Sequence, residues 1–220
     1  MKKLFIFDFD GTVVDTITDV GLCFNEALRQ NDLPQHPLKR FDSFVGGNLE
    51  TVVSRMLPLG AVTEENITKV KTLYRSLYLA STKPNTKPYP GMMELLAGLK
   101  GAGALLAVNS NKGQQLLNDM VDKLFPAGFF DAVVGYQEDR PSKPDPYGVN
   151  MICKICGCTD AVYIGDGKSD LDTAENAGIP CVLVLWGQGS KADREDPRAV
   201  ARVNTTEELR MVLFAEERFL

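Results

Sequence analysis

The sequence predicts an α/β fold in which a doubly wound parallel sheet carries an inserted α-helical domain. Continuous apolar runs, typical of strands buried on both faces, occur at residues 4–7, 104–109, 131–135, 161–165 and 181–186. Helical patterns separate the later runs, and this alternation favours parallel strands. The second run follows the first after an interval much longer than one crossover helix, which indicates an insertion.

The insertion contains helical patterns and no strand-like run. The stretches "TITDVGLCFNEALRQ", "NLETVVSRML" and "TEENITKVKTLYRSLYLA" have the spacing of amphipathic helices. Thr16 and Asp19 predict a capping box at the start of the first helix, and the prolines of "TKPYPG" stop the last one. We therefore expect a helical domain at 14–87, joined by two linkers to a core domain formed by 1–13 and 88–220.

Four further helices are expected after the second strand, at residues 113–125, 146–157, 169–178 and 205–213. Gly178 is a natural C-cap for the third of them. The last opens with threonines and an acidic first turn, which is typical of a helix start.

Composition argues against several classes of function. The 220 residues are 44% hydrophobic and carry a net charge of −5. The basic residues are scattered along the sequence. Neither a nucleic-acid-binding stripe nor a membrane anchor is indicated. The opening "MKKLFIF" resembles a signal peptide, but Asp8 and Asp10 interrupt its apolar region too early. We expect a cytoplasmic protein with neither a nucleic-acid nor a membrane partner, and we leave its oligomeric state open.

Two features are better explained by structure than by chemistry. Cys153, Cys156 and Cys158 could supply thiolates to zinc, but Cys153 and Cys156 have helical spacing with apolar neighbours, and no nearby histidine completes the site. The single histidine, His36, lies in a proline-flanked turn. Catalysis by histidine pairs is therefore not expected, and carboxylates and lysines remain the candidates for chemistry.

Those candidates gather at strand ends. Since ligands of open α/β sheets bind beyond the carboxyl ends of the strands, the polar residues placed there should lie close together. Four carboxylates, two lysines, a hydroxyl and an amide are expected at this edge, the residues being Asp8, Asp10, Ser110, Asn111, Lys112, Lys143, Asp166 and Asp170.

Such a cluster of carboxylates requires a cation. Asp8 and Asp10, at alternate strand positions, would repel each other by about 2–3 kcal/mol. Ligands that are all hard oxygens favour Mg²⁺, and the candidate ligands are Asp8, Asp10, Asp166 and Asp170.

With Mg²⁺ and a lysine to remove the repulsion, a carboxylate can attack phosphorus and form an aspartyl-phosphate, while a second aspartate moves protons. Lys143 is the candidate catalytic lysine. The residues expected to hold phosphate oxygens are Ser110, Asn111 and Gly11.

These motifs resemble those of the haloacid dehalogenase-like superfamily over nearly the whole chain. "DFDGTVVD" is similar to its first motif, Ser110 in "VNSNK" to its second, Lys143 in "SKPDP" to its third, and "GDGKSDLDTAENAG" to its fourth. The resemblance implies that Asp8 is the nucleophile and Asp10 the general acid/base. It also implies that Mg²⁺ is bound by Asp8, Asp166 and the backbone carbonyl of Asp10, with Asp170 in support, and that the helical insertion is a cap domain.

The phosphoglycolate phosphatase-like subgroup is the most similar. We therefore expect a magnesium-dependent phosphatase of small phosphomonoesters, with phosphoglycolate as the first candidate. The loop at Gly46, Gly47 and Asn48 is the candidate substrate loop, although both glycines could serve only the turn. One departure from the family is Gly167, which stands where serine or threonine is common.

Two alternatives remain. Asp10 disfavours the dehalogenase and phosphonatase branches, which lack an aspartate there. A sugar phosphomutase stays possible, although "DTITDVG" lacks the histidine that mutases usually carry. A regulator that binds phosphate or metal without turnover is the other alternative, and a second aspartate in the motif argues against it.

Overall fold

The computed structural model describes residues 3–46 and 48–215. The chain divides into two compact units, one formed by Met1–Val14 with Lys87–Leu220 and the other by Asp15–Thr86. We describe each unit by itself. None of the described helices is both long and apolar enough to cross a membrane.

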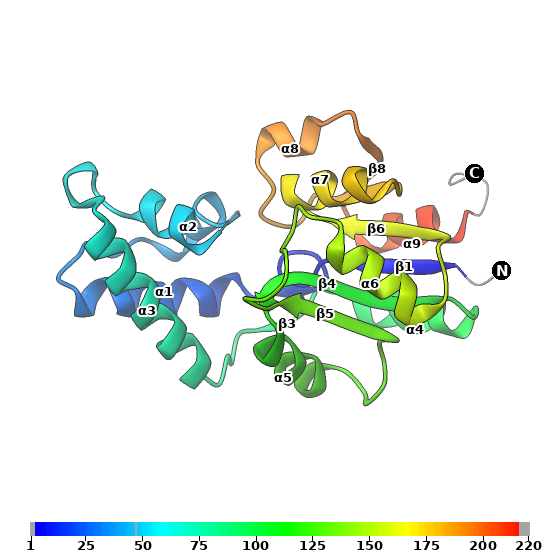
Figure 1. Ribbon diagram of the computed structural model, residues 1–220, viewed down its shortest axis with the longest axis horizontal. Helices are drawn as coiled ribbons and strands as arrows, with labels where there is room; N and C mark the ends of the chain where they lie inside the picture. The colour runs from blue at the N-terminus through cyan, green and yellow to red at the C-terminus, as the bar shows by residue number, and fades with distance from the viewer. Residues whose placement is uncertain (1–2, 47, 216–220) are drawn as a thin grey trace. The chain divides into compact units, whose positions relative to one another are not determined.

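The core unit is built on a six-stranded parallel sheet (Figure 1). Its strands are β1 (Leu4–Phe7), β4 (Leu105–Gly113), β5 (Ala132–Tyr136), β6 (Ala161–Gly165), β7 (Cys181–Val184) and β8 (Ala199–Val203). They lie in the order β5-β4-β1-β6-β7-β8, so the chain extends from β1 in one direction and then returns to build the other side. The predicted doubly wound sheet is confirmed, and β1 lies at the point where the strand order reverses, which is where open sheets bind ligands.

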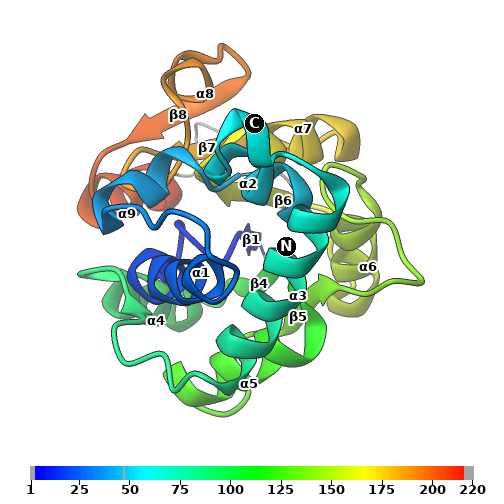
Figure 2. The same cartoon turned by 90° about the vertical axis from the view of Figure 1, so that its left-hand side faces the viewer.

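Helices cover both faces of this sheet (Figures 1 and 2). Those of the core unit are α4 (Met92–Gly101), α5 (Gln114–Leu124), α6 (Tyr147–Cys156), α7 (Lys168–Ala177), α8 (Lys191–Glu195) and α9 (Thr206–Phe214). Phe5 and Phe7 pack with α4, α5 and α9, whereas Leu4 and Ile6 pack with α6 and α7. Alternate residues of β1 thus enter two different cores, which explains why the strand is apolar throughout.

Several elements were not predicted. β8 is an edge strand, buried at its two ends and exposed or half-exposed between them. It therefore lacks the continuous apolar run by which the other strands were recognised. Helix α4 was also missed. No strand was predicted in the two linkers, but each contains a short one, β2 (Val14–Asp15) and β3 (Lys87–Pro88), and these two strands pair with each other.

The second unit is helical. It contains α1 (Ile17–Gln30), the 3₁₀ helix η1 (Leu38–Ser43), α2 (Leu49–Met56), the 3₁₀ helix η2 (Leu59–Ala61) and α3 (Glu64–Ala80). Stacking of Phe24 on Tyr74, with ring centroids 3.7 Å apart, joins α1 to α3.

The predicted capping box at Thr16 and Asp19 is wrong. Thr16 makes no side-chain cap bond. The buried Asp19 carboxylate instead accepts hydrogen bonds from Asn85 N (3.0 Å), Asn85 Nδ2 (2.9 Å) and Thr86 Oγ1 (2.7 Å). Asp19 therefore attaches the chain at residues 85 and 86, where it returns to the core unit, to α1. This tertiary contact replaces the predicted capping of the helix.

Candidate active site

The carboxyl end of β1 positions Asp8. Its backbone N–H donates to the Ile164 carbonyl oxygen (2.8 Å), which continues the ladder between β1 and β6 for one more residue. By strand alternation its side chain lies on the same side of the sheet as Ile6, the side covered by α6 and α7. That side also receives Lys143 from the loop before α6 and Asp170 from α7.

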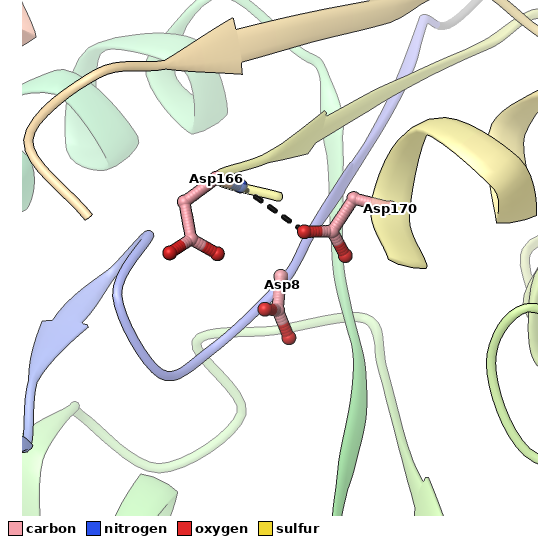
Figure 3. A group of neighbouring side chains, drawn as sticks. All are labelled: Asp8, Asp166 and Asp170. Atoms are coloured by element: carbon pink, nitrogen blue, oxygen red, sulfur yellow. Dashed lines mark hydrogen bonds between the residues drawn. The ribbon is translucent and has the colours of Figure 1, made fainter. Parts of the chain in front are cut away.

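Three buried carboxylates meet there (Figure 3). Asp8, Asp166 and Asp170 each offer one oxygen, and these atoms all lie within 4.8 Å of one another. Asp166 follows directly after β6, and Asp170 lies in the first turn of α7. Residues that the sequence places far apart are brought together because β1 and β6 are neighbours in the sheet.

Lys143 joins two of these carboxylates. Its Nζ lies 2.8 Å from Asp8 Oδ1 and 2.7 Å from Asp170 Oδ1, and all three side chains are almost completely buried. Burial by itself would lower the pKa of Lys143, but the charges of Asp170 and Asp8 overcome this and hold that pKa well above its usual value. The ammonium is therefore a permanent positive charge beside Asp8.

Burial acts on the carboxylates in the opposite direction. It raises the pKa of Asp8 to about 7, because the Lys143 charge only partly offsets desolvation and the nearby Asp170 and Asp10 oppose ionisation. Burial, followed by repulsion from Asp170 and Asp8, also raises the pKa of Asp166 well above its usual value. The protein alone thus disfavours full ionisation of this cluster.

Asp170 is held by protein groups on both oxygens. Oδ1 bonds to Lys143, and Oδ2 accepts from the backbone N–H groups of Asp166 (3.1 Å) and Gly167 (3.2 Å). The first of these backbone bonds is drawn in Figure 3. Asp170 therefore orients Asp166 and Lys143. By contrast, Asp8 and Asp166 each have one carboxylate oxygen that makes no hydrogen bond within the described part of the chain.

The loop after β7 completes the surroundings of Asp166, and this loop was missed from the sequence. Gln188 donates its backbone N–H to Asp166 Oδ2 (2.6 Å). Gly11, at φ +81°, passes so close that a Cβ would lie 2.6 Å from the same oxygen, and a Cβ on Gly187 would also meet Asp166. The signal in the sequence was the glycine pair of "GQG" directly after a predicted strand.

The other predicted residues lie around β4. Ser110 is buried, and its Oγ accepts from the Lys112 backbone N–H (3.2 Å). Asn111 bonds to the backbone of Lys143 at two points, Oδ1 to N (3.0 Å) and Nδ2 to O (3.3 Å). Asn111 thus fastens the Lys143 loop to β4, a positioning role that was not predicted, and phosphate binding by Ser110, Asn111 and Gly11 stays a prediction.

Asp10 is more exposed than Asp8. Its Oδ1 lies 3.2 Å from Nζ of Lys112, whose side chain is only 8% exposed. Each aspartate of the "DFD" motif therefore has its own lysine.

The cluster has the donor groups of a cation site. Four carboxylates (Asp8, Asp10, Asp166 and Asp170) gather here with two ammonium groups (Lys112 and Lys143), so the carboxylates outnumber the lysines beside them. The donors are hard oxygens, which suit a small divalent cation. Among the described residues, no other set of three or more His, Cys, Asp or Glu side chains converges in this way.

The candidate substrate loop belongs to the helical unit. Gly46 has φ +103° and open space where a Cβ would stand. Asn48 caps α2, because its side chain accepts from Thr51 N (2.9 Å). Gly47 lies outside the described residues. Arg55, which was not predicted, donates from Nη1 to the carbonyl oxygens of Phe44 (3.1 Å) and Gly46 (2.8 Å) and so braces this loop.

Comparison with known proteins supports the family that the sequence motifs resemble. Residues 5–184 match the family model of haloacid dehalogenase-like hydrolases. The chain is 35% identical over 185 residues to a phosphoglycolate phosphatase of Caulobacter vibrioides, covering 82% of this chain and 78% of that protein. It is 30% identical over 187 residues to a phosphoglycolate phosphatase of Aquifex aeolicus, covering 84% and 85%.

A crystal structure from Lactobacillus delbrueckii subsp. bulgaricus, provisionally named a phosphoglycolate phosphatase, superposes with a TM-score of 0.88 at 27% identity over 97% of this chain and 98% of that one. The predicted family is confirmed: this chain belongs to the haloacid dehalogenase-like hydrolases.

Proposed function

We propose that the protein is a magnesium-dependent phosphatase of small phosphomonoesters, with phosphoglycolate as the first candidate substrate. The observation that carries the proposal is the buried Asp8, which lies against the Lys143 ammonium and beside Asp166 and Asp170 at the end of β1. The names of the relatives support the choice of phosphoglycolate.

Asp8 is the nucleophile. Its carboxylate attacks phosphorus, the ester oxygen leaves, and an aspartyl-phosphate forms on Asp8. Lys143 makes this approach possible because its charge reduces the repulsion between a carboxylate and a phosphate dianion. Ser110, fixed by the Lys112 backbone, holds one of the phosphoryl oxygens.

Asp10 is the general acid/base. It gives a proton to the leaving oxygen in the first step and takes one from water in the second, when water releases phosphate from Asp8. Its greater exposure suits an exchange of protons with substrate and water, whereas Asp8 is shielded.

Asp8, Asp166 and the backbone carbonyl of Asp10 would hold Mg²⁺, and Asp170 would orient them. When bound, the ion supplies positive charge to the transferring phosphoryl oxygens and neutralises the carboxylates. The excess of carboxylates over lysines, and the raised pKa of Asp8 and Asp166 that this crowding and burial produce, support this assignment.

The helical unit is proposed to act as a cap that limits the size of the substrate. It is an insertion held by two linkers whose short strands pair, an arrangement suited to motion as one body. The loop at Gly46, Gly47 and Asn48 is the proposed substrate loop. Since the Asn48 side chain already caps α2, the loop would contact substrate chiefly through its backbone.

The decisive experiment measures phosphate release from phosphoglycolate, hexose phosphates, nucleotides and a phosphopeptide, with Mg²⁺, with Ca²⁺ and with a chelator. We expect activity on small monoesters with Mg²⁺, little with Ca²⁺, whose larger coordination shell suits this geometry poorly, and none with chelator. Preference for the phosphopeptide would overturn the cap argument. Full activity in metal-free protein would overturn the mechanism, and phosphate transfer between hexose positions would instead indicate a mutase.

A further inference from the structure

We infer that Lys112 is a positioning residue for Asp10, aimed at it by a bulge in β4. The inference rests on the proposed function, because it concerns how Asp10 is prepared to protonate the leaving group. Lys112 lies in the strand-end cluster expected from the sequence, but the mechanism above gives its side chain no part.

The bulge lies at the carboxyl end of β4. Asn109 pairs with Val134 and Gly113 with Tyr136, so β4 advances four residues while β5 advances two. Ser110, Asn111 and Lys112 fill this irregular stretch. A bulge of this kind redirects side chains and is common beside active sites.

Gly135 on β5 makes room for the bulge. A Cβ at this position would lie 2.7 Å from the Lys112 carbonyl oxygen and 2.8 Å from Gln114 Cα. The Gln114 side chain then accepts the Gly135 N–H (2.7 Å), which closes the irregular segment. The close packing of the β4 backbone against Gly135 therefore fixes the position from which the Lys112 side chain extends.

Lys112 contacts two residues of the proposed mechanism. Its backbone N–H donates to Ser110 Oγ (3.2 Å), and its Nζ lies 3.2 Å from Asp10 Oδ1. With a side chain only 8% exposed, this lysine is unlike the solvated lysines of surface ion pairs, such as Lys69, whose side chain is 54% exposed. A shielded ammonium restricts the rotamers of the Asp10 carboxylate and so keeps it directed at one place.

Lys112→Met tests this role through the leaving group. An alkyl phosphate such as phosphoglycolate releases a strongly basic alkoxide that must be protonated, whereas p-nitrophenyl phosphate releases a weakly basic anion that leaves unaided. The parameter kcat/KM reports the step that forms the aspartyl-phosphate for both substrates. We expect it to fall about tenfold or more for the alkyl ester, as part of the 10²–10⁴-fold that a general acid contributes, and to change little for the aryl ester.

Several variants complete the experiment. Lys112→Gln provides a second neutral side chain should the methionine variant fold poorly, and Lys112→Arg should restore part of the alkyl activity. In an Asp10→Asn background, Lys112→Met should add little, since both changes affect one proton transfer. Lys3→Met is the matched control, because Lys3 pairs with Asp160 (2.9 Å) at the opposite end of the sheet, and both substrates should be unaffected.

The outcomes separate the two claims. An equal fall for both esters, or no fall for either, would overturn the role of Lys112 while leaving the phosphatase in place. A wild-type protein that hydrolyses neither ester would overturn the proposed function and, with it, this inference. A selective loss for the alkyl ester would establish Lys112 as the residue that positions Asp10.

Discussion

At the scale of single residues, Asp8 is a buried carboxylate under opposing influences. Desolvation favours its neutral form, and the Lys143 ammonium at 2.8 Å favours the charged form that a nucleophile needs. Asp8→Asn should keep the fold, because asparagine is isosteric, but it should abolish turnover. We expect less than about 1% of wild-type kcat, since loss of a nucleophile removes several powers of ten. Phosphate release and the far-UV circular dichroism spectrum check this, and retention of more activity would contradict the covalent mechanism.

Lys143 should affect both rate and stability. Lys143→Ala leaves Asp8 and Asp170 without their shared ammonium, so kcat/KM should fall by about a hundredfold or more. The free energy of unfolding should fall by about 3–5 kcal/mol in chelator, the range for breaking a buried ion pair. Lys168→Ala is the control, because that lysine is exposed in an i,i+4 pair with Asp172. Equal effects of the two changes in urea titrations and rate assays would show that Lys143 contributes no more to rate or stability than a surface lysine does.

At the scale of elements, the attachment of the returning linker to α1 depends on one carboxylate. Asp19→Ala removes the acceptor for three hydrogen bonds, two from the exposed Asn85 and one from Thr86, whose buried hydroxyl loses this acceptor. We expect a loss of about 2–4 kcal/mol in unfolding free energy, with faster amide exchange near residue 85, because bonds to a charged acceptor are worth more than neutral ones. Asp122→Ala, on the exposed face of α5, should change stability by less than about 0.5 kcal/mol. An Asp19 variant as stable as this control would refute the assignment.

At the scale of the whole molecule, stability should depend jointly on pH and Mg²⁺. Burial raises the pKa of Asp8 from 3.8 to about 7 in the metal-free protein, so between those values the folded state binds more protons than the unfolded state. The contribution of this group to stability is therefore present below about pH 4 and is lost as pH rises toward 7. A cation on the carboxylates favours their charged form and removes this loss.

Mg²⁺ should consequently raise Tm more at pH 8 than at pH 5. Differential scanning calorimetry with Mg²⁺ or chelator at both pH values measures the effect, and the difference should shrink in Asp8→Asn and Asp166→Asn variants. The same gain in Tm at both pH values would show that these carboxylates are not the ones that bind the ion.

Much of the architecture follows from local patterns. Apolar runs identify β1, β4, β5, β6 and β7, because strands between two helical layers must be apolar on both faces. Gly178 at φ +68° and Thr205, which accepts from Glu208 N, end and begin their helices as predicted, since both signals depend on a few neighbouring residues. The placement of Asp8, Asp166 and Lys143 at one edge follows in turn from the parallel topology.

Only the tertiary structure decided which partners the polar side chains take. Asp19 has the sequence spacing of a cap but bonds to residues 66 and 67 positions away. Asn111 was expected to bind phosphate but holds the backbone of Lys143. Lys112 points at Asp10 because Gly135, on another strand, makes room for a bulge. Hydrophobic periodicity depends on residues a few positions apart and is visible in the sequence. The partner of a carboxylate or an amide depends on which distant segments the folded backbone brings within about 3 Å, and only the packed chain determines that.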